Sequence, residues 1–495
     1  MREDYSDNGD AWSHFPHEHA RSRAYRWGED GIAGLSDNHQ RLCFGLSLWN
    51  GEDPILKERL FGVTGHQGNH GEDVKELYYY LDSTPTHSYM KFLYKYPQRR
   101  FPYEDLVQEN QRRDRNCDEY EILDTDAFED DRYWDVFLEV GLAILRCFPP
   151  ANAPPQYAKD EEDPDSVYIR ITAYNRGPDP ATLHIIPQLW FPNTWSWPLE
   201  KPPMPSLSGS VKGPDETRCI SVQHPDLGKT HLYCLPSPPP VGPTTDFEVD
   251  PTFDVVQPAL LFTENNTNFA RLYGGQNETM FVKDAFHDHI IPFHRPPESA
   301  SEPETFFAPR IRSRTASLFA HERPDLPEEG PCTPFPLGAN FVNPELKGTK
   351  SAAHYTFRDV PGQGGCAVVR LKLTANKLGK DISLEDEIAF DDAVEERRQE
   401  ADEFYEALVK GAPMSDDLRQ IMRQALGGML WTKQFYRFIQ KEWLEGDPAQ
   451  PPPPPNRRFI RNKVRVRTRL VDRPKSFPRN GSTCTSRMFC RCRIS

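Results

Sequence analysis

The segment that most constrains the fold is Ser415–Leu444, with the sequence SDDLRQIMRQALGGMLWTKQFYRFIQKEWL. Its apolar residues recur every three or four positions, which predicts an α-helix with one apolar stripe. Ser415 supplies an N-cap, and Asp416 and Asp417 place negative charge where it favours the helix dipole. Gly446–Pro448 ends the helix. The stripe consists of Leu418, Ile421, Met422, Ala425, Leu426, Met429, Leu430, Phe435, Ile439 and Trp443.

The chain before this helix reads mainly as strands. Val167–Tyr174 and Thr182–Trp190 alternate between apolar and polar residues around the turn Asn175–Pro178, which predicts a β-hairpin. Many strands with turn spacing indicate a mainly β protein built on a large β-sandwich. The other predicted strands are Gln40–Asn50, Tyr78–Leu81, Tyr89–Tyr94, Trp134–Leu142, Cys219–Val222, Thr230–Cys234, Ala259–Phe262, Arg271–Tyr273, His354–Phe357 and Ala367–Lys372.

Three regions follow from these patterns. Residues 1–390 form the N-terminal sandwich domain, with a disordered insertion at about 295–340 that is rich in Pro, Glu and Ser. Residues 391–456 hold a linker helix and the helix described above, and 457–495 form a disordered basic tail. We expect the linker helix to place Val394, Ala401, Phe404, Tyr405 and Leu408 on one side.

Charge limits the partners. The chain has 59 basic and 74 acidic residues, a net charge of −15, which argues against nucleic acid or an anionic membrane. The tail is the exception, with 13 Lys and Arg against Asp472 alone. A nucleic-acid-binding tail is an alternative, but its arginines are not interleaved with aromatic residues and the acidic body would repel the same partner.

Compartment and metal content can also be predicted. The N-terminus lacks an apolar signal-peptide core, no apolar run approaches ~20 residues, and the ten cysteines are scattered, which favours a cytoplasmic protein with reduced thiols. Two histidine groups lack metal-site spacing, so we expect polar loop histidines and neither metal nor cofactor. They are His66, His70 and Asp73, and His287, His289 and His294. Gly362–Gly365 precedes a strand, which predicts a turn and not a phosphate loop.

Four segments carry a resemblance to a known family: His19–Gly34, Leu56–Gln98, Gln188–Trp197 and Gly427–Pro448. Together they resemble glycoside hydrolase family 63, the relatives of mannosyl-oligosaccharide glucosidase and mannosylglycerate hydrolase. The resemblance implies an N-terminal sandwich followed by an (α/α)6 barrel. It also implies an inverting exo-glycosidase acting on α-linked sugars, with one carboxylic acid and one carboxylate flanking the scissile bond.

The resemblance makes Ser415–Leu444 the first barrel helix. It places three aromatic or polar side chains near the sugar pocket, namely Trp431, Gln434 and Tyr436. It stops after Asn462, where the family continues with its catalytic motif. We therefore expect a tail produced by a frameshift or missed splice, a start truncated at Met1, and no catalytic carboxylate in this chain.

Two functions remain open at this point. The first is a family 63-like glycosidase that is inactive as this chain alone. The second is a carbohydrate-binding or structural sandwich without catalysis. In either case the stripe on Ser415–Leu444 would lack its barrel partners, so we expect it to be exposed and to drive self-association.

Overall fold

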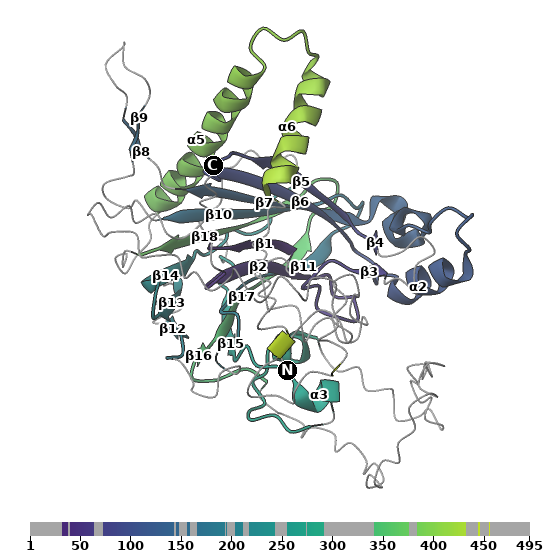
Figure 1. Cartoon of the computed structure of the whole chain (residues 1–495), viewed down its shortest axis with the longest axis vertical. Coiled ribbons are helices and arrows are strands. Elements are labelled where there is room, and N and C mark those ends of the chain that lie inside the picture. Colours follow the sequence, from purple (N-terminus) through teal and green to yellow (C-terminus); the bar gives the residue numbers. More distant parts are fainter. Residues whose placement is uncertain are drawn as a thin grey trace.

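The computed structural model describes residues 32–37, 40–63, 73–142, 145–147, 156–158, 166–193, 195, 203–210, 217–242, 255–273, 275–291, 341–375, 384–431, 444–445 and 455. These residues form a mainly β protein with two large antiparallel sheets (Figure 1). The predicted insertion at about 295–340 and the tail at 457–495 lie outside them. Within the described residues, no helix combines the length and the apolar character needed to cross a membrane.

The larger sheet has nine strands. In spatial order they are β16 (Lys347–Gly348), β12 (Ser206–Ser210), β13 (Arg218–His224), β14 (Gly228–Cys234), β18 (Cys366–Thr374), β10 (Val167–Asn175), β7 (Tyr133–Leu142), β6 (Tyr89–Pro97) and β5 (Leu77–Ser83). The five-stranded sheet has the order β1 (Ile32–Ser36), β2 (Cys43–Trp49), β11 (Ala181–Trp190), β17 (Lys350–Val360) and β15 (Ala259–Thr263). Two small ribbons pair β3 (Gly62–Val63) with β4 (Asp73–Val74), and β8 (Leu145–Cys147) with β9 (Gln156–Ala158).

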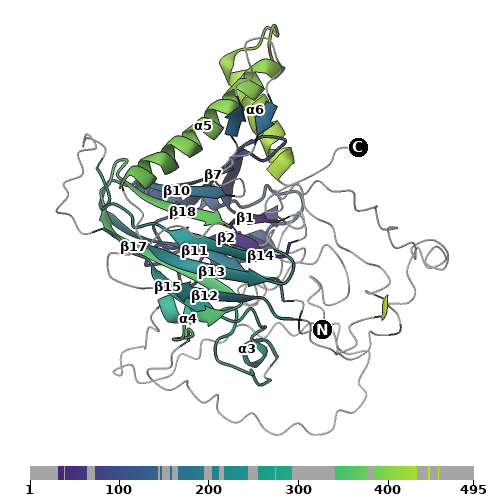
Figure 2. The ribbon, with the colours of Figure 1, turned by 90° about the vertical axis from the view of Figure 1, so that its left-hand side faces the viewer.

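The two sheets enclose one apolar core (Figure 2). Val167, Ile169 and Ile171 of β10 are buried at alternate positions, because successive side chains of a strand point to opposite faces. Leu183 and Ile185 of β11 meet them from the five-stranded sheet. The outward positions of β10 are free to carry polar residues, and α5 (Leu384–Leu408) docks on this side.

The predicted hairpin is wrong, although both of its strands exist. β10 pairs with β7 and β18, whereas β11 pairs with β2 and β17 in the opposite sheet. The connection is therefore an arch across the sandwich. The buried Asn175 shapes it, since its amide donates to the carbonyls of Asp179 and Val360 and its side-chain oxygen accepts from Gly177 N.

A second arch lies against the first. β17 and β18 also belong to opposite sheets, and Gly362–Gly365 forms the turn between them, as predicted. Gly364 N donates to Asn175 O, and Asn175 N donates to Gly365 O. A Cβ on Gly362 would lie 2.4 Å from Pro178 O, so only glycine allows the arches to approach this closely. The two sheet crossings thus form one hydrogen-bonded unit.

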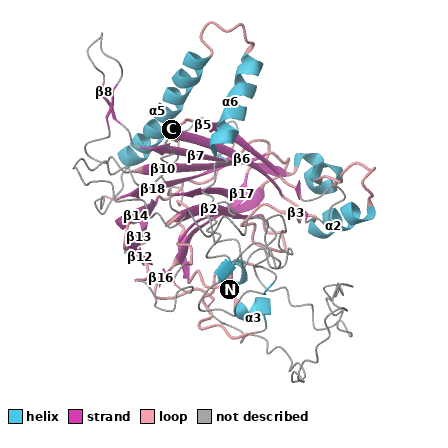
Figure 3. Ribbon diagram, viewed as in Figure 1, coloured by secondary structure: helices cyan, strands magenta, loops and turns pink. Residues whose placement is uncertain are grey.

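Two long helices pack on the larger sheet, α5 on its outer face and α6 (Asp416–Trp431) against its edge strand β5 (Figures 1 and 3). α5 begins earlier than predicted and buries Val394, Ala401 and Tyr405, whereas Phe404 and Leu408 are exposed. The predicted strand at Arg271–Tyr273 is also wrong. The shorter helices are α2 (Tyr103–Arg112), η2 (Ile122–Asp124), η3 (Asp126–Asp131), α3 (Phe269–Tyr273) and α4 (Ala285–Ile290).

Candidate functional site: the helix pair on the outer sheet

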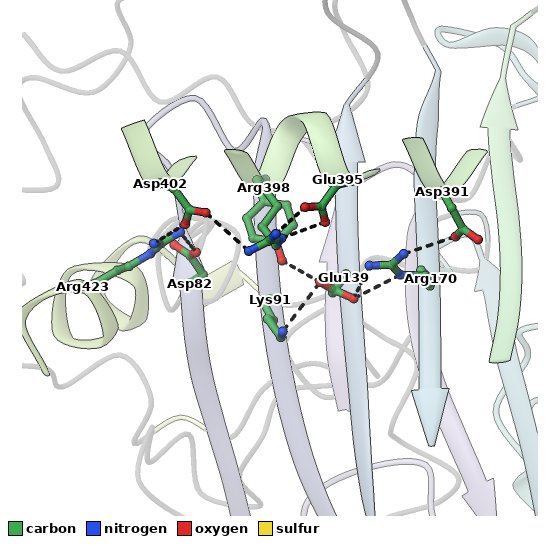
Figure 4. Close-up of polar contacts among 10 residues, drawn as sticks. Asp82, Lys91, Glu139, Arg170, Asp391, Glu395, Arg398, Asp402 and Arg423 are labelled. Atoms are coloured by element: carbon green, nitrogen blue, oxygen red, sulfur yellow. Dashed lines mark hydrogen bonds and ion pairs between the residues drawn. The ribbon is translucent and has the colours of Figure 1, made fainter. Parts of the chain in front are cut away.

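The candidate site is the helix pair α5–α6 and the sheet face beneath it. Outward-facing charged side chains on neighbouring strands form ion pairs with α5 (Figure 4). Arg170 of β10 donates to Glu139 of β7 at 2.9 Å and to Asp391 of α5 at 3.2 Å. Arg370 of β18 donates to the second oxygen of Asp391 at 2.7 Å. Asp391 therefore joins α5 to two strands through two guanidinium groups.

Glu139 organises the middle of this face. Tyr89 of β6 donates its hydroxyl to Glu139 Oε1 at 2.6 Å. Burial alone would raise the pKa of Glu139, but the positive charges of Arg170 and Lys91 outweigh it and hold the pKa below its ordinary value. Glu139 is therefore a carboxylate at neutral pH and pairs with the Arg170 guanidinium.

A separate contact seats α6 on β5, the edge strand of the larger sheet. Arg423 of α6 donates to Asp402 of α5 at 2.6 Å and also to Asp82 of β5 (Figure 4). Tyr405 of α5 donates to Ser83 O at 2.7 Å. Burial raises the pKa of Asp82, although Arg423 opposes that rise.

Gly427 allows α6 to approach this closely. A Cβ on Gly427 would lie 3.0 Å from Ser83 N and 3.1 Å from the backbone of Asp82. At Gly428 the nearest atom is Tyr80 Cβ, 3.9 Å away. Both glycines therefore face β5, but only Gly427 lies tightly against the backbone of the strand.

Trp431, which we predicted near a sugar pocket, ends the described part of α6. Its ring lies 5.6 Å from that of Tyr80 and 5.8 Å from that of Phe92. Tyr78 completes the cluster, 5.8 Å from Tyr80. Trp431 is thus packed into a half-buried aromatic cluster at the sheet edge. The tyrosine run in β5 was the available sequence signal for these partners. Gln434 and Tyr436 lie outside the described residues.

Much of the apolar stripe of α6 points away from this seat, whereas its members Met422 and Leu430 are half-buried. Arg423, Gly427 and Trp431 are four residues apart and share one helix face, since an α-helix turns by about 100° per residue. Leu418, Ile421, Ala425 and Met429 lie on the opposite face. Leu418, Ile421 and Met429 are 50%, 55% and 72% exposed. α6 therefore presents its apolar side outward, and Leu426 is exposed next to it.

The structure describes only part of the two histidine groups. Within the described parts of the chain, no three His, Cys, Asp or Glu side chains are grouped so that they could hold a metal ion. His287 and His289 belong to α4, a helix and not the loop that we predicted, and His287 Nδ1 accepts from Leu56 N at 3.2 Å. Asp73 belongs to β4, and His66, His70 and His294 lie outside the described residues.

The protein is thus a two-sheet β-sandwich with a pair of helices docked on its larger sheet. No known family profile matches the chain. The chain is 40% identical over 480 residues to the uncharacterized protein YMR196W of Saccharomyces cerevisiae. The alignment covers 94% of this chain and 38% of that relative, so the chain spans about two fifths of the relative's length.

Proposed function

We propose that this chain is the sandwich region of a family 63-type glycoside hydrolase, an inverting exo-glycosidase acting on α-linked oligosaccharides or glycosides. In this proposal α5 and α6 carry the interface to a helical catalytic domain. The chain alone performs no hydrolysis, because the carboxylic acid and the carboxylate that such a reaction needs belong to that domain.

The orientation of α6 is the observation that carries this proposal. A surface helix normally buries its apolar stripe against its own core. α6 instead contacts the sheet through Arg423, Gly427 and Trp431 and leaves Leu418, Ile421 and Met429 outward. A contiguous apolar face of this kind marks an interaction surface. Further helices of a barrel would cover it, and the greater length of the yeast relative is consistent with such a domain.

Two experiments test the proposal. The chain and the full-length yeast relative, which is the longer protein, are incubated with α-glucosyl oligosaccharides and with mannosylglycerate. We expect hydrolysis by the longer protein only. Turnover by this chain, or none by either protein with any α-linked substrate, would overturn the assignment.

The second experiment examines the interface. Light scattering should show concentration-dependent self-association of this chain, and the double variant I421E/M429E should abolish it. Leu123→Glu is the matched control, because Leu123 is 64% exposed but lies far from α6 in the sequence and outside its stripe. A monodisperse wild-type monomer would contradict an interface on α6.

A carbohydrate-binding sandwich is the second candidate, and the aromatic cluster favours it. Tyr78, Tyr80 and Trp431 are only half-buried, and aromatic rings with an exposed part can stack on sugar faces. Calorimetry with the same oligosaccharides separates the two functions. Binding by this chain that is lost in Trp431→Ala, without turnover in the longer protein, would favour this second function.

A further inference from the structure

Two histidines meet on the outer face of the five-stranded sheet, on the other side of the sandwich from α5 and α6. His184 of β11 lies opposite Thr356 of β17, and His354 is two residues from Thr356, so all three side chains share one face. His184 Nδ1 and His354 Nε2 are 2.7 Å apart. The Thr356 hydroxyl lies 3.3 Å from each of these nitrogens. Three donor atoms therefore converge on one point.

The surroundings keep both imidazoles neutral. Trp49 packs on His184 with ring centroids 4.8 Å apart, and the two imidazole rings stack at 5.0 Å. Burial lowers the pKa of His184 to about 4 and that of His354 to about 3. The positive charge of Arg358 lowers the pKa of His184 further, and the neighbouring imidazoles of His184 and of His289 on α4 lower that of His354. Both imidazoles are therefore uncharged at neutral pH.

A neutral imidazole offers what a transition metal needs, namely a nitrogen lone pair without competition from a proton. One of the two facing nitrogens carries the shared hydrogen, and the other accepts it. When a metal binds, that hydrogen moves to the outer nitrogen of the same ring, so both facing nitrogens become ligands and no proton is released.

We propose that His184 and His354 form a two-imidazole binding site for a divalent transition-metal ion. Zn–N bonds of about 2.0–2.1 Å in a tetrahedral arrangement place two nitrogens about 3.3 Å apart, so the pair opens by roughly 0.6 Å. Water fills the remaining positions, with the Thr356 hydroxyl beside them. Imidazole ligands select Cu²⁺, Ni²⁺ and Zn²⁺ over Mg²⁺, and Cu²⁺ binds most tightly.

Calorimetric titration of the full chain with Cu²⁺ and Zn²⁺ at pH 7.5 tests the site. The chain has 15 histidines, so the informative quantity is the difference between variants. We expect His184→Gln and His354→Gln each to bind one equivalent less than wild type. His224→Gln is the matched control, a partly buried histidine on β13 of the other sheet. Equal stoichiometry in all four proteins would overturn the proposal.

Thermal unfolding without metal first establishes that each variant folds. A measurement on the wild-type chain then tests the site without any substitution. In ¹⁵N-histidine spectra of the wild-type chain, sub-stoichiometric Cu²⁺ should broaden two ring signals together, those with the lowest pKa values. Broadening that never reaches these two signals, or reaches only one of them, would equally overturn the proposal.

Discussion

Asp53 is a buried side chain in the loop after β2. Replacing it with asparagine should stabilise the protein more at pH 7.5 than at pH 4. Asp53 Oδ2 accepts the hydroxyls of Tyr96 at 3.0 Å and Tyr103 at 3.1 Å. Burial raises the pKa of Asp53 to about 6, against the opposing effects of Lys57 and of its hydrogen bonds. The folded protein therefore binds this proton more tightly than the unfolded chain, for which the ordinary value is 3.8.

The magnitude follows from linkage. A shift of about two pKa units corresponds to about 3 kcal/mol at 1.36 kcal/mol per unit. Because the folded pKa is the higher one, this contribution to stability is complete below pH 3.8 and is lost as pH rises through 6. Asp53→Asn keeps an oxygen for both phenols and removes the charge. It should raise the free energy of unfolding at pH 7.5 relative to wild type, and this advantage should shrink by about 2 to 3 kcal/mol at pH 4.

Urea unfolding followed by fluorescence at pH 4, 5, 6 and 7.5 measures this difference directly. Glu52→Gln is the matched control, since Glu52 is the preceding residue and is exposed. Its difference from wild type should not vary with pH in the same way. If the difference between Asp53→Asn and wild type is constant from pH 4 to 7.5, the burial argument for Asp53 is refuted.

Three further substitutions test the seat of the helices and the arches. Gly428→Ala should raise the free energy of unfolding by up to about 1 kcal/mol, because alanine has the higher helix propensity. Gly427→Ala should raise it less, or lower it, because the added Cβ would crowd Asp82 and Ser83. Urea unfolding curves of the two variants compare them, and equal gains would contradict the close packing of α6 on β5. Arg423→Met should lower the free energy of unfolding by about 3 kcal/mol, because it leaves Asp82 buried without its partner. Adding Asp82→Asn to this variant should restore part of the loss, and no rescue would argue against the ion pair. Asn175→Ala should cost about 3 kcal/mol, because several buried hydrogen bonds are lost; a thermal midpoint equal to that of wild type would show that the arch does not depend on them.

Local patterns predicted most strands and the inward positions on them. Alternation shows which side of a strand faces the core, but not which sheet the strand joins. The alternation therefore predicted the strands β10 and β11 correctly, but the prediction that they pair with each other was wrong. At Arg271–Tyr273, a short segment flanked by turn residues gave no period from which helix and strand could be distinguished.

The sites depended on contacts that no local pattern contains. Asp82 and Arg423 are 341 residues apart, and His184 and His354 are 170 apart. The stripe on α6 was visible in the sequence. The sequence did not show that the sheet would contact the opposite face of this helix, because that contact consists of one arginine, one glycine and one tryptophan.

The position of α6 also bears on how the sandwich resists unwanted strand pairing. β5 is a terminal strand of its sheet and pairs only with β6 among the described strands. Such an edge leaves backbone groups available to an extended segment of another chain. α6 lies directly against Asp82 and Ser83, and Trp431 lies over Tyr80. The helix that offers an apolar face to a partner therefore also shields this edge, and a change that frees α6 would expose both surfaces at once.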